Sequence, residues 1–176
     1  MYIHFYKINI FLPNKISMKY FALKISSIIN NYKITNLDYL KKNTKFKFLI
    51  YIKGDLGMGK TFFCKHFLKS FGIKKYIKSP TYSIFQYYKV SSILFCHFDF
   101  YRLNKLKEFF EIGIQESIYE NSLFLIEWPE KISNIFYTPD LSIEFNFKNR
   151  QTRNISIFSY SIRGHYCIKK FFKKYS

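Results

Sequence analysis

The stretch Gly54-Asp55-Leu56-Gly57-Met58-Gly59-Lys60-Thr61 lies between an apolar run, residues 48–52, and a helical run, residues 62–71. Its spacing, G-x-x-x-x-G-K-T between a strand and a helix, is that of a phosphate-binding loop. Backbone N–H groups of such a loop surround phosphate oxygens, and the following helix adds unpaired N–H groups and the positive end of its dipole. The sequence therefore predicts a nucleotide-binding site at this loop.

Two side chains of the loop have defined chemical tasks in this motif. Lys60 reaches the β- and γ-phosphates, and the Thr61 hydroxyl holds a magnesium ion, so ATP and Mg²⁺ are the expected cofactors. The glycines permit backbone angles and close approaches that a Cβ would block. Asp55 lies inside the loop, where it can support the site from behind. The positions of this segment expected at the nucleotide are Asp55, Gly57, Met58, Gly59, Lys60, Thr61 and Phe62.

The composition limits the chain to one globular domain. Its 176 residues, 48% of them apolar, are enough for a proper core and too few for two domains. The net charge of +18, from 29 basic and 11 acidic residues, favours a nucleic-acid partner. The same charge is expected from AT-rich codons, because these encode the abundant Lys, Asn, Ile, Phe and Tyr. Both explanations of the charge stay open.

The cysteines and the ends of the chain indicate where the protein works and how it is divided. Three cysteines without a C-x-x-C pair predict neither a disulfide framework nor a zinc site, and reduced thiols suit the cytoplasm. The apolar run at residues 1–12 is too short to span a membrane. Met18 is an alternative start. The expected division is a poorly ordered extension at 1–17, a domain at 18–160 and a basic, aromatic tail at 161–176.

Short apolar runs of strand length alternate along the chain with runs at helical spacing, and this order predicts an α/β fold. The short link at 89–92 predicts an antiparallel hairpin, and the fully apolar run at 123–126 predicts a central strand buried on both faces. The expected strands are 46–53, 82–88, 93–98, 123–126, 141–147 and 154–160, and the expected helices are 20–32, 62–71 and 104–110.

Two carboxylates are placed to serve a bound magnesium nucleotide, which needs at least one acid near the metal or the attacking water. Asp99 and Glu127 each end a predicted strand, at the edge of the sheet where open α/β proteins bind ligands. His97 lies two residues before Asp99, and a lone histidine in a strand is expected to pack or to form a hydrogen bond.

Missing motifs exclude a GTPase and leave a kinase open. A GTPase would have D-x-x-G after its second strand, but Asp99 is followed three residues later by Arg102. The guanine motif N-K-x-D fails at its last position, in Asn104-Lys105-Leu106-Lys107. A small-molecule kinase remains an alternative, with Arg102, Arg150 and Arg153 as its candidate phosphate contacts.

Four segments in this order resemble a known family. They are Gly54 to Thr61, Lys78-Ser79-Pro80-Thr81-Tyr82, His97-Phe98-Asp99-Phe100-Tyr101-Arg102-Leu103 and Ile126-Glu127-Trp128-Pro129-Glu130. The chain is similar over about residues 46–160 to TsaE (YjeE), the bacterial ATPase of tRNA threonylcarbamoyladenosine (t6A) synthesis. The resemblance implies a three-layer α/β domain of the P-loop NTPase type with a mixed parallel and antiparallel sheet.

The resemblance also implies roles for individual residues. Residues 57–61 would hold the triphosphate, and Thr61 and Glu127 would coordinate magnesium. Residues 79–82 resemble a switch-like segment near the γ-phosphate, and Asp99 resembles the essential acid, acting as base, water-positioner or metal partner. Arg153 is placed where the family often has a basic residue near the nucleotide. The implied catalytic residues are Lys60, Thr81, Asp99 and Glu127.

The resemblance finally implies partners. Members of the family bind the TsaB and TsaD proteins, and their ATP hydrolysis, weak alone, resets that complex, so tRNA is reached only indirectly. Met58 replaces the usual alanine, and the N-terminal segment, which contributes to the family's adenine pocket, matches poorly. Two alternatives stay open: a small-molecule P-loop kinase, and a basic RNA-binding module whose nucleotide site has decayed.

Overall fold

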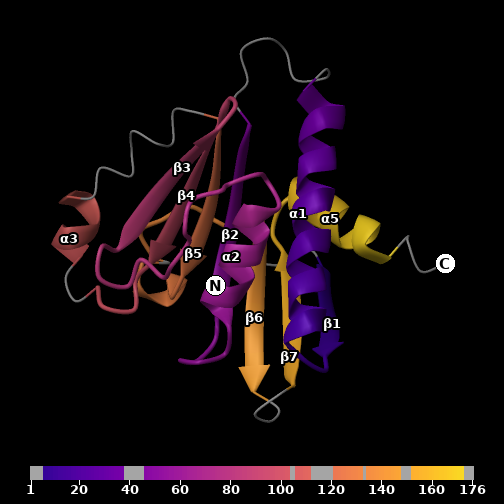
Figure 1. Ribbon diagram of the computed structural model, residues 1–176, viewed down its shortest axis with the longest axis horizontal. Coiled ribbons are helices and arrows are strands. Elements are labelled where there is room, and N and C mark those ends of the chain that lie inside the picture. The colour runs from indigo at the N-terminus through magenta and orange to yellow at the C-terminus, as the bar shows by residue number, and fades with distance from the viewer. Residues whose placement is uncertain are drawn as a thin grey trace.

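The computed structural model describes residues 6–37, 46–103, 106–111, 121–132, 134–147 and 152–172. Figure 1 shows a sheet with helices packed against it. The elements in chain order are β1 (Tyr6–Leu12), α1 (Lys15–Leu37), β2 (Lys47–Lys53), α2 (Lys60–Lys69), β3 (Phe85–Val90), β4 (Ile93–Asp99), α3 (Leu106–Glu111), β5 (Ser122–Glu127), the 3-10 helix η1 (Pro129–Lys131), β6 (Leu141–Phe147), β7 (Arg153–Ser159) and α5 (Ile162–Phe172).

The strands form one mixed seven-stranded sheet in the order β1-β7-β6-β2-β5-β4-β3. β2 pairs in parallel with β5 and β6, and β5 pairs in parallel with β4. β3, β7 and β1 are added antiparallel to β4, β6 and β7, respectively. The predicted hairpin is therefore β3–β4, and the predicted central strand is β5, which is buried along its whole length. The predicted α/β fold with a mixed sheet is confirmed.

Alternation along the strands divides the core between the two faces of the sheet. On β2, Ile50 packs in the cluster shared with α1, α2 and α5, whereas Tyr51 packs in a second cluster on the opposite face. Phe109 of α3 belongs to that second cluster. Both faces of the central strands are thus covered, which explains why β2 and β5 are almost entirely apolar.

The start of α1 follows from a reciprocal cap. Asn14 Oδ1 accepts a hydrogen bond from the Ser17 backbone N–H at 2.9 Å, and Ser17 Oγ accepts one from the Asn14 N–H at 3.1 Å. Such a cap satisfies helix N–H groups that have no intrahelical partner. The helix begins at Lys15, five residues before the predicted start, and its buried side, including Phe21 and Ile25, packs against α2 and the sheet.

Both ends of the described chain pack against the rest of the domain. β1 pairs with β7 along seven residues, and its Ile8 and Leu12 are buried. α5 packs against α1 and β7 and buries Cys167 and Ile168. Each segment contributes apolar side chains to the core, which is the physical reason why it does not stand apart from the domain.

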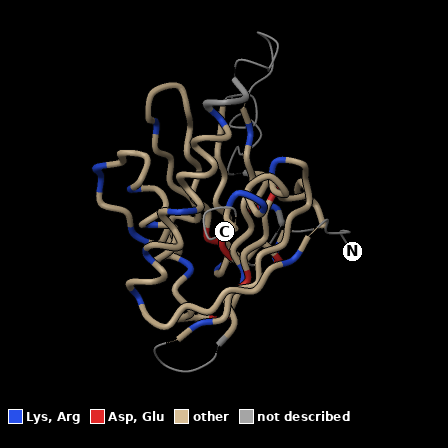
Figure 2. Tube along the Cα trace, turned by 90° about the vertical axis from the view of Figure 1, so that its right-hand side faces the viewer, with Lys and Arg blue, Asp and Glu red and all other residues tan. Residues whose placement is uncertain are grey.

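Some sequence predictions lie outside the described residues. These are the first positions of the helix predicted at 104–110 and the phosphate contact proposed for Arg150. Within the described ranges, no helix is both long enough and apolar enough to cross a membrane. In Figure 2, Lys and Arg are spread along the trace, whereas Asp and Glu are few.

Candidate nucleotide-binding site

The loop predicted to bind phosphate connects the end of β2 to the start of α2. Gly54 has a φ of +127°, and a Cβ there would lie 2.5 Å from the Phe145 carbonyl oxygen, so only glycine fits. Gly59, with a φ of +99°, is the N-cap residue of α2 and lies against Met18. The backbone therefore turns from strand to helix in the way that the motif requires.

Lys60 is buried at the centre of this loop, with 4% of its surface exposed. Its Nζ donates to the Gly54 carbonyl at 2.5 Å and to the Asp55 carbonyl at 2.8 Å, and it lies 4.0 Å from the centre of the Trp128 ring. Burial lowers the pKa of Lys60, while the nearby charge of Glu127 acts in the opposite direction. The Lys60 ammonium donates here to neutral carbonyl oxygens. A phosphate anion is a stronger hydrogen-bond acceptor than a carbonyl, so it can replace them.

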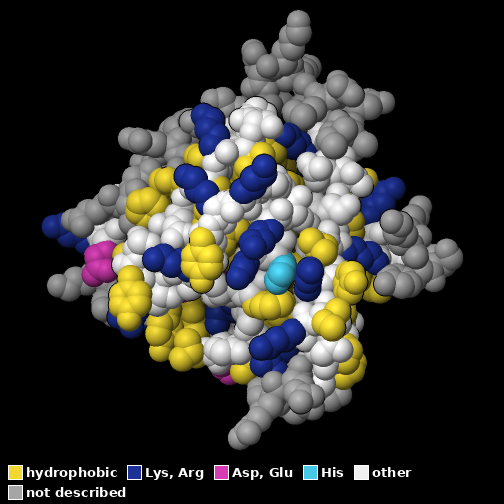
Figure 3. Space-filling model, viewed as in Figure 1, with side chains coloured by type: hydrophobic (Ala, Val, Ile, Leu, Met, Phe, Trp, Pro, Cys, Tyr) yellow, Lys and Arg dark blue, Asp and Glu magenta, His cyan; other side chains and the backbone are white. Residues whose placement is uncertain are grey.

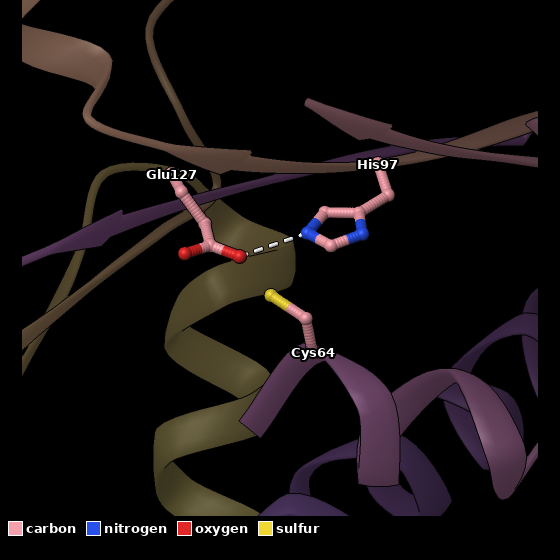
Figure 4. Close-up of side chains that lie close together, drawn as sticks. All are labelled: Cys64, His97 and Glu127. Atoms are coloured by element: carbon pink, nitrogen blue, oxygen red, sulfur yellow. Dashed lines mark hydrogen bonds and ion pairs between the residues drawn. The ribbon is translucent and has the colours of Figure 1, made fainter. Parts of the chain in front are cut away.

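Glu127 is held by a partner on each carboxylate oxygen. The Thr61 hydroxyl donates to Oε2 at 3.0 Å, and His97 Nε2 lies 2.9 Å from Oε1. His97 and Glu127 are both fully buried or nearly so. Figure 4 shows the two side chains turned toward each other from neighbouring strands, with Cys64 of α2 beside them. The hydrogen bond expected of His97 is therefore made to the predicted magnesium ligand.

Asp99 anchors the segment that follows α2. Its Oδ2 accepts hydrogen bonds from Ser79 Oγ at 2.5 Å and from Thr81 Oγ1 at 2.6 Å, and its Oδ1 accepts one from the Tyr101 N–H at 3.1 Å. The carboxylate is almost fully buried. The structure therefore brings Thr81 and Asp99 together, although 18 positions separate them in the sequence.

Parallel pairing places the two acids at the same edge of the sheet. Asp99 and Glu127 are register partners at the carboxyl ends of β4 and β5, and both charges act on Lys60. This is the edge at which an open α/β sheet binds its ligand. The predicted catalytic residues Lys60, Thr81, Asp99 and Glu127 thus lie around one end of β4, β5 and the loop.

A pocket of about 630 Å³ opens beside the loop. It is formed by the start of α1, the loop and β7, and its lining residues are Asn14, Lys15, Ile16, Met18, Gly57, Met58, Gly59, Phe62 and Arg153. Arg153 Nε donates to the Met58 carbonyl at 3.1 Å, so Arg153 braces the loop. The α1 residues are those that the sequence could not assign to the site, since they lie outside the recognisable motifs.

Other predicted positions are placed differently. The Asp55 side chain is exposed; its backbone carbonyl accepts a hydrogen bond from Lys60, and its charge acts on the same ammonium. Arg102, a candidate phosphate contact of a kinase, instead lies 4.2 Å from the centre of the Tyr82 ring and donates to the Tyr82 hydroxyl at 3.3 Å. These contacts support the loop and the segment after α2 but add no catalytic group.

The arrangement fits a magnesium nucleotide. Lys60 and the N-terminus of α2 supply positive potential for phosphate oxygens. Thr61 and Glu127 supply the hard oxygen ligands that Mg²⁺ prefers. A strand, a glycine-rich turn and a helix start that together face two strand-end carboxylates define an α/β protein of the P-loop type.

Comparison with known proteins gives the family. The profile of threonylcarbamoyl adenosine biosynthesis protein TsaE matches residues 17–155, and the chain belongs to this family. A tRNA threonylcarbamoyladenosine biosynthesis protein TsaE of Haemophilus influenzae is 30% identical over 161 residues, which cover 92% of this chain and 95% of the relative. One of Rickettsia felis is 36% identical over 137 residues, covering 76% and 80% of the two chains.

A solved structure supports the fold alone. The crystal structure of Bacillus subtilus YdiB superposes with a TM-score of 0.71 at 19% identity, and the match covers 97% of both chains.

Proposed function

We propose that this protein binds ATP with Mg²⁺ and hydrolyses it as a component of the machinery that makes threonylcarbamoyladenosine in tRNA. The observation that carries the proposal is the convergence of Lys60, the Thr61–Glu127 pair and Asp99 at the phosphate loop. Family membership supports the pathway, because the relatives carry that role in their names.

In this proposal the loop residues bind and orient the triphosphate. Lys60 leaves the Gly54 and Asp55 carbonyls and donates to the β- and γ-phosphates, and the N–H groups at the start of α2 bind the remaining oxygens. Thr61 and Glu127 would hold Mg²⁺, which would neutralise charge on the phosphates. Phe62 and the α1 side of the neighbouring pocket would exclude water from the base.

Asp99 would act on the water that attacks the γ-phosphate. Its hydrogen bonds to Ser79 and Thr81 fix both the carboxylate and the segment that would face the γ-phosphate. A carboxylate held in this way accepts a proton from the water or orients it for in-line attack. Lys60 would offset the charge that develops on the transferred phosphoryl group.

The proposed partners are TsaB and TsaD, with tRNA reached through the complex and all components in the cytoplasm. We expect slow hydrolysis by the protein alone and activation by these partners, which could act on the segment whose Ser79 and Thr81 donate to Asp99. Figure 3 shows Lys and Arg side chains scattered over the face that carries α1, α2 and α5. Burial lowers the pKa of His66. The charges of three nearby lysines, Lys19, Lys65 and Lys69, lower it further.

The test is phosphate release from ATP by the purified protein, first alone and then with a TsaB–TsaD pair. Strong stimulation by the pair supports both the chemistry and the partners. Phosphate transfer to a small acceptor, without stimulation, would favour the kinase. RNA binding that is salt-sensitive and unaffected by ATP would favour the basic RNA-binding module.

A further inference from the structure

Cys64, His97 and Glu127 form a buried cluster of side chains. The proposed hydrolysis uses Glu127 but gives the three side chains no shared role. Among the described residues, Cys64 Sγ, a ring nitrogen of His97 and a Glu127 carboxylate oxygen lie within 4.8 Å of one another. They come from α2, β4 and β5, and all three side chains are buried. Figure 4 shows the sulfur directed toward the space between the carboxylate and the imidazole.

The cysteine spacing predicted no zinc site, but it carries no information on residues that the fold brings together. We propose that Cys64, His97 and Glu127 form a binding site for a zinc-like divalent cation, and that its occupation inhibits the protein. Thiolate, imidazole and carboxylate are the ligands that Zn²⁺ prefers, and three protein ligands leave a fourth position for water. Mg²⁺ takes hard oxygen ligands in octahedral geometry, so this donor set selects against it.

The geometry needs only small movements. Tetrahedral zinc with bonds of about 2.0–2.3 Å places its ligand atoms about 3.3–3.8 Å apart. The 2.9 Å separation of His97 Nε2 and Glu127 Oε1 would therefore widen by a few tenths of an ångström. The largest separation in the group, at most 4.8 Å, would close by about 1 Å.

Charge balance favours the complex in a buried place. The cation carries two positive charges, and the thiolate and carboxylate carry two negative ones, so the bound group is neutral and the cost of burying charge is small. Without the cation, burial raises the pKa of the Cys64 thiol well above its usual range. Binding forms the metal–sulfur bond and releases the thiol proton to water, without any change of oxidation state. The imidazole ligates through Nε2 as the tautomer whose proton is on Nδ1, so the hydrogen bond from Nε2 to Glu127 is exchanged for bonds of both groups to the cation.

Mg²⁺ and the zinc-like cation would bind different oxygens of the Glu127 carboxylate. Oε2 faces the Thr61 hydroxyl, on the side where Mg²⁺ would be held, whereas Oε1 faces His97 and Cys64. A cation on Oε1 withdraws electron density from the carboxylate and fixes its rotation. Magnesium-dependent hydrolysis should therefore fall when the inner site is filled. The inhibition rests on the proposed function, but the binding itself does not.

The first experiment uses Co²⁺ as an optical substitute for Zn²⁺ on the full-length protein. One equivalent of Co²⁺ should produce an intense thiolate-to-cobalt charge-transfer band in the near ultraviolet, and Zn²⁺ should abolish it. Cys64→Ser should remove the band and weaken Zn²⁺ binding by more than about 100-fold, since even loss of an outer hydrogen-bond partner costs 10–100-fold. Cys167→Ser, a second buried cysteine outside the cluster, is the matched control and should keep the band.

The outcomes separate this proposal from the proposed function. A missing band, or a band that survives Cys64→Ser, would overturn the site. If Cys64→Ser does not fold, His97→Asn tests the same site, and an unchanged band there would equally refute it. With Mg²⁺ present throughout, Zn²⁺ should also slow ATP hydrolysis more in the Cys167→Ser protein than in the Cys64→Ser protein, each relative to its own rate without Zn²⁺. A bound cation without this difference refutes the inhibition, whereas no hydrolysis at all with Mg²⁺ and without Zn²⁺ or Co²⁺ refutes the proposed function instead.

Discussion

Asp99 and Glu127 are register partners on neighbouring parallel strands, yet each carboxylate has its own hydroxyl donor. Thr81, in the segment after α2, donates to Asp99. Thr61, in the first turn of α2, donates to Glu127. Adjacent acids with separate donors can be given separate chemistry by their surroundings. Substitution of one acid should therefore change a different measured quantity from substitution of the other.

Lys60→Ala should reduce ATP hydrolysis by about 100-fold or more, because it removes a preorganised cation from the phosphates. The measurement is phosphate release at saturating ATP, with thermal unfolding recorded to show that the variant is folded. Lys69→Ala, at an exposed position of the same helix, is the matched control and should hydrolyse ATP normally. Unchanged turnover in Lys60→Ala would mean that the loop is not the active site.

Glu127→Gln should raise the Mg²⁺ concentration needed for half-maximal ATP binding by about tenfold to a hundredfold. The amide keeps the shape of the side chain but lacks the charge and one acceptor. The measurement is a magnesium titration of nucleotide binding. Glu130→Gln changes an exposed acid three residues further along and should leave the titration where it is. A titration that is the same in both variants would remove Glu127 from the metal site.

Asp99→Asn should lower kcat by about 100-fold while ATP affinity changes little, because loss of a general base or water-positioning group acts on the chemical step. The comparison is single-turnover hydrolysis against equilibrium binding of a non-hydrolysable analogue. Equal losses in binding and in rate would instead show that Asp99, through Ser79 and Thr81, only holds the segment after α2 in place.

Ile8→Ala should lower the free energy of unfolding by about 2–4 kcal/mol, since Ile8 is buried in the main core cluster. Lys7→Ala, on the exposed side of the same strand, should cost less than about 1 kcal/mol even though Lys7 lies over the Phe158 ring. Urea unfolding measures both. An equal effect of the two substitutions would mean that β1 does not pack as the structure shows. Deletion of residues 1–17 removes the whole strand and should destabilise the domain further.

Local patterns were sufficient to predict the centre of the fold. The run at 123–126 is apolar because β5 is covered on both faces, and the loop is recognisable because Gly54 and Gly59 adopt backbone angles that few other residues tolerate. β1 was not predicted because its apolar residues, Ile8, Ile10, Phe11 and Leu12, form a short run that Lys7 precedes and Asn9 interrupts. Its partner, β7, is separated from it by most of the chain. Pairing over such a distance leaves no local signal.

The part of the site that lies in recognisable motifs could also be predicted from the sequence. Lys60, Thr61, Asp99 and Glu127 follow recognisable strands or belong to the loop, so their positions at one sheet edge could be inferred. The contact of Cys64 with the His97–Glu127 pair could not be, because it depends on how α2 lies on the sheet. The α1 residues of the pocket are separated from the loop by tens of residues and have no motif.

The contact between Lys60 and Trp128 gives the molecule an optical signal of its own. Trp128 is the single tryptophan of the sequence, and its indole ring lies 4.0 Å from the Lys60 ammonium. A phosphate that draws the ammonium away changes the electric field on that ring and hence its emission. Binding of a nucleotide to the loop should therefore be measurable by intrinsic fluorescence in unlabelled protein, in real time.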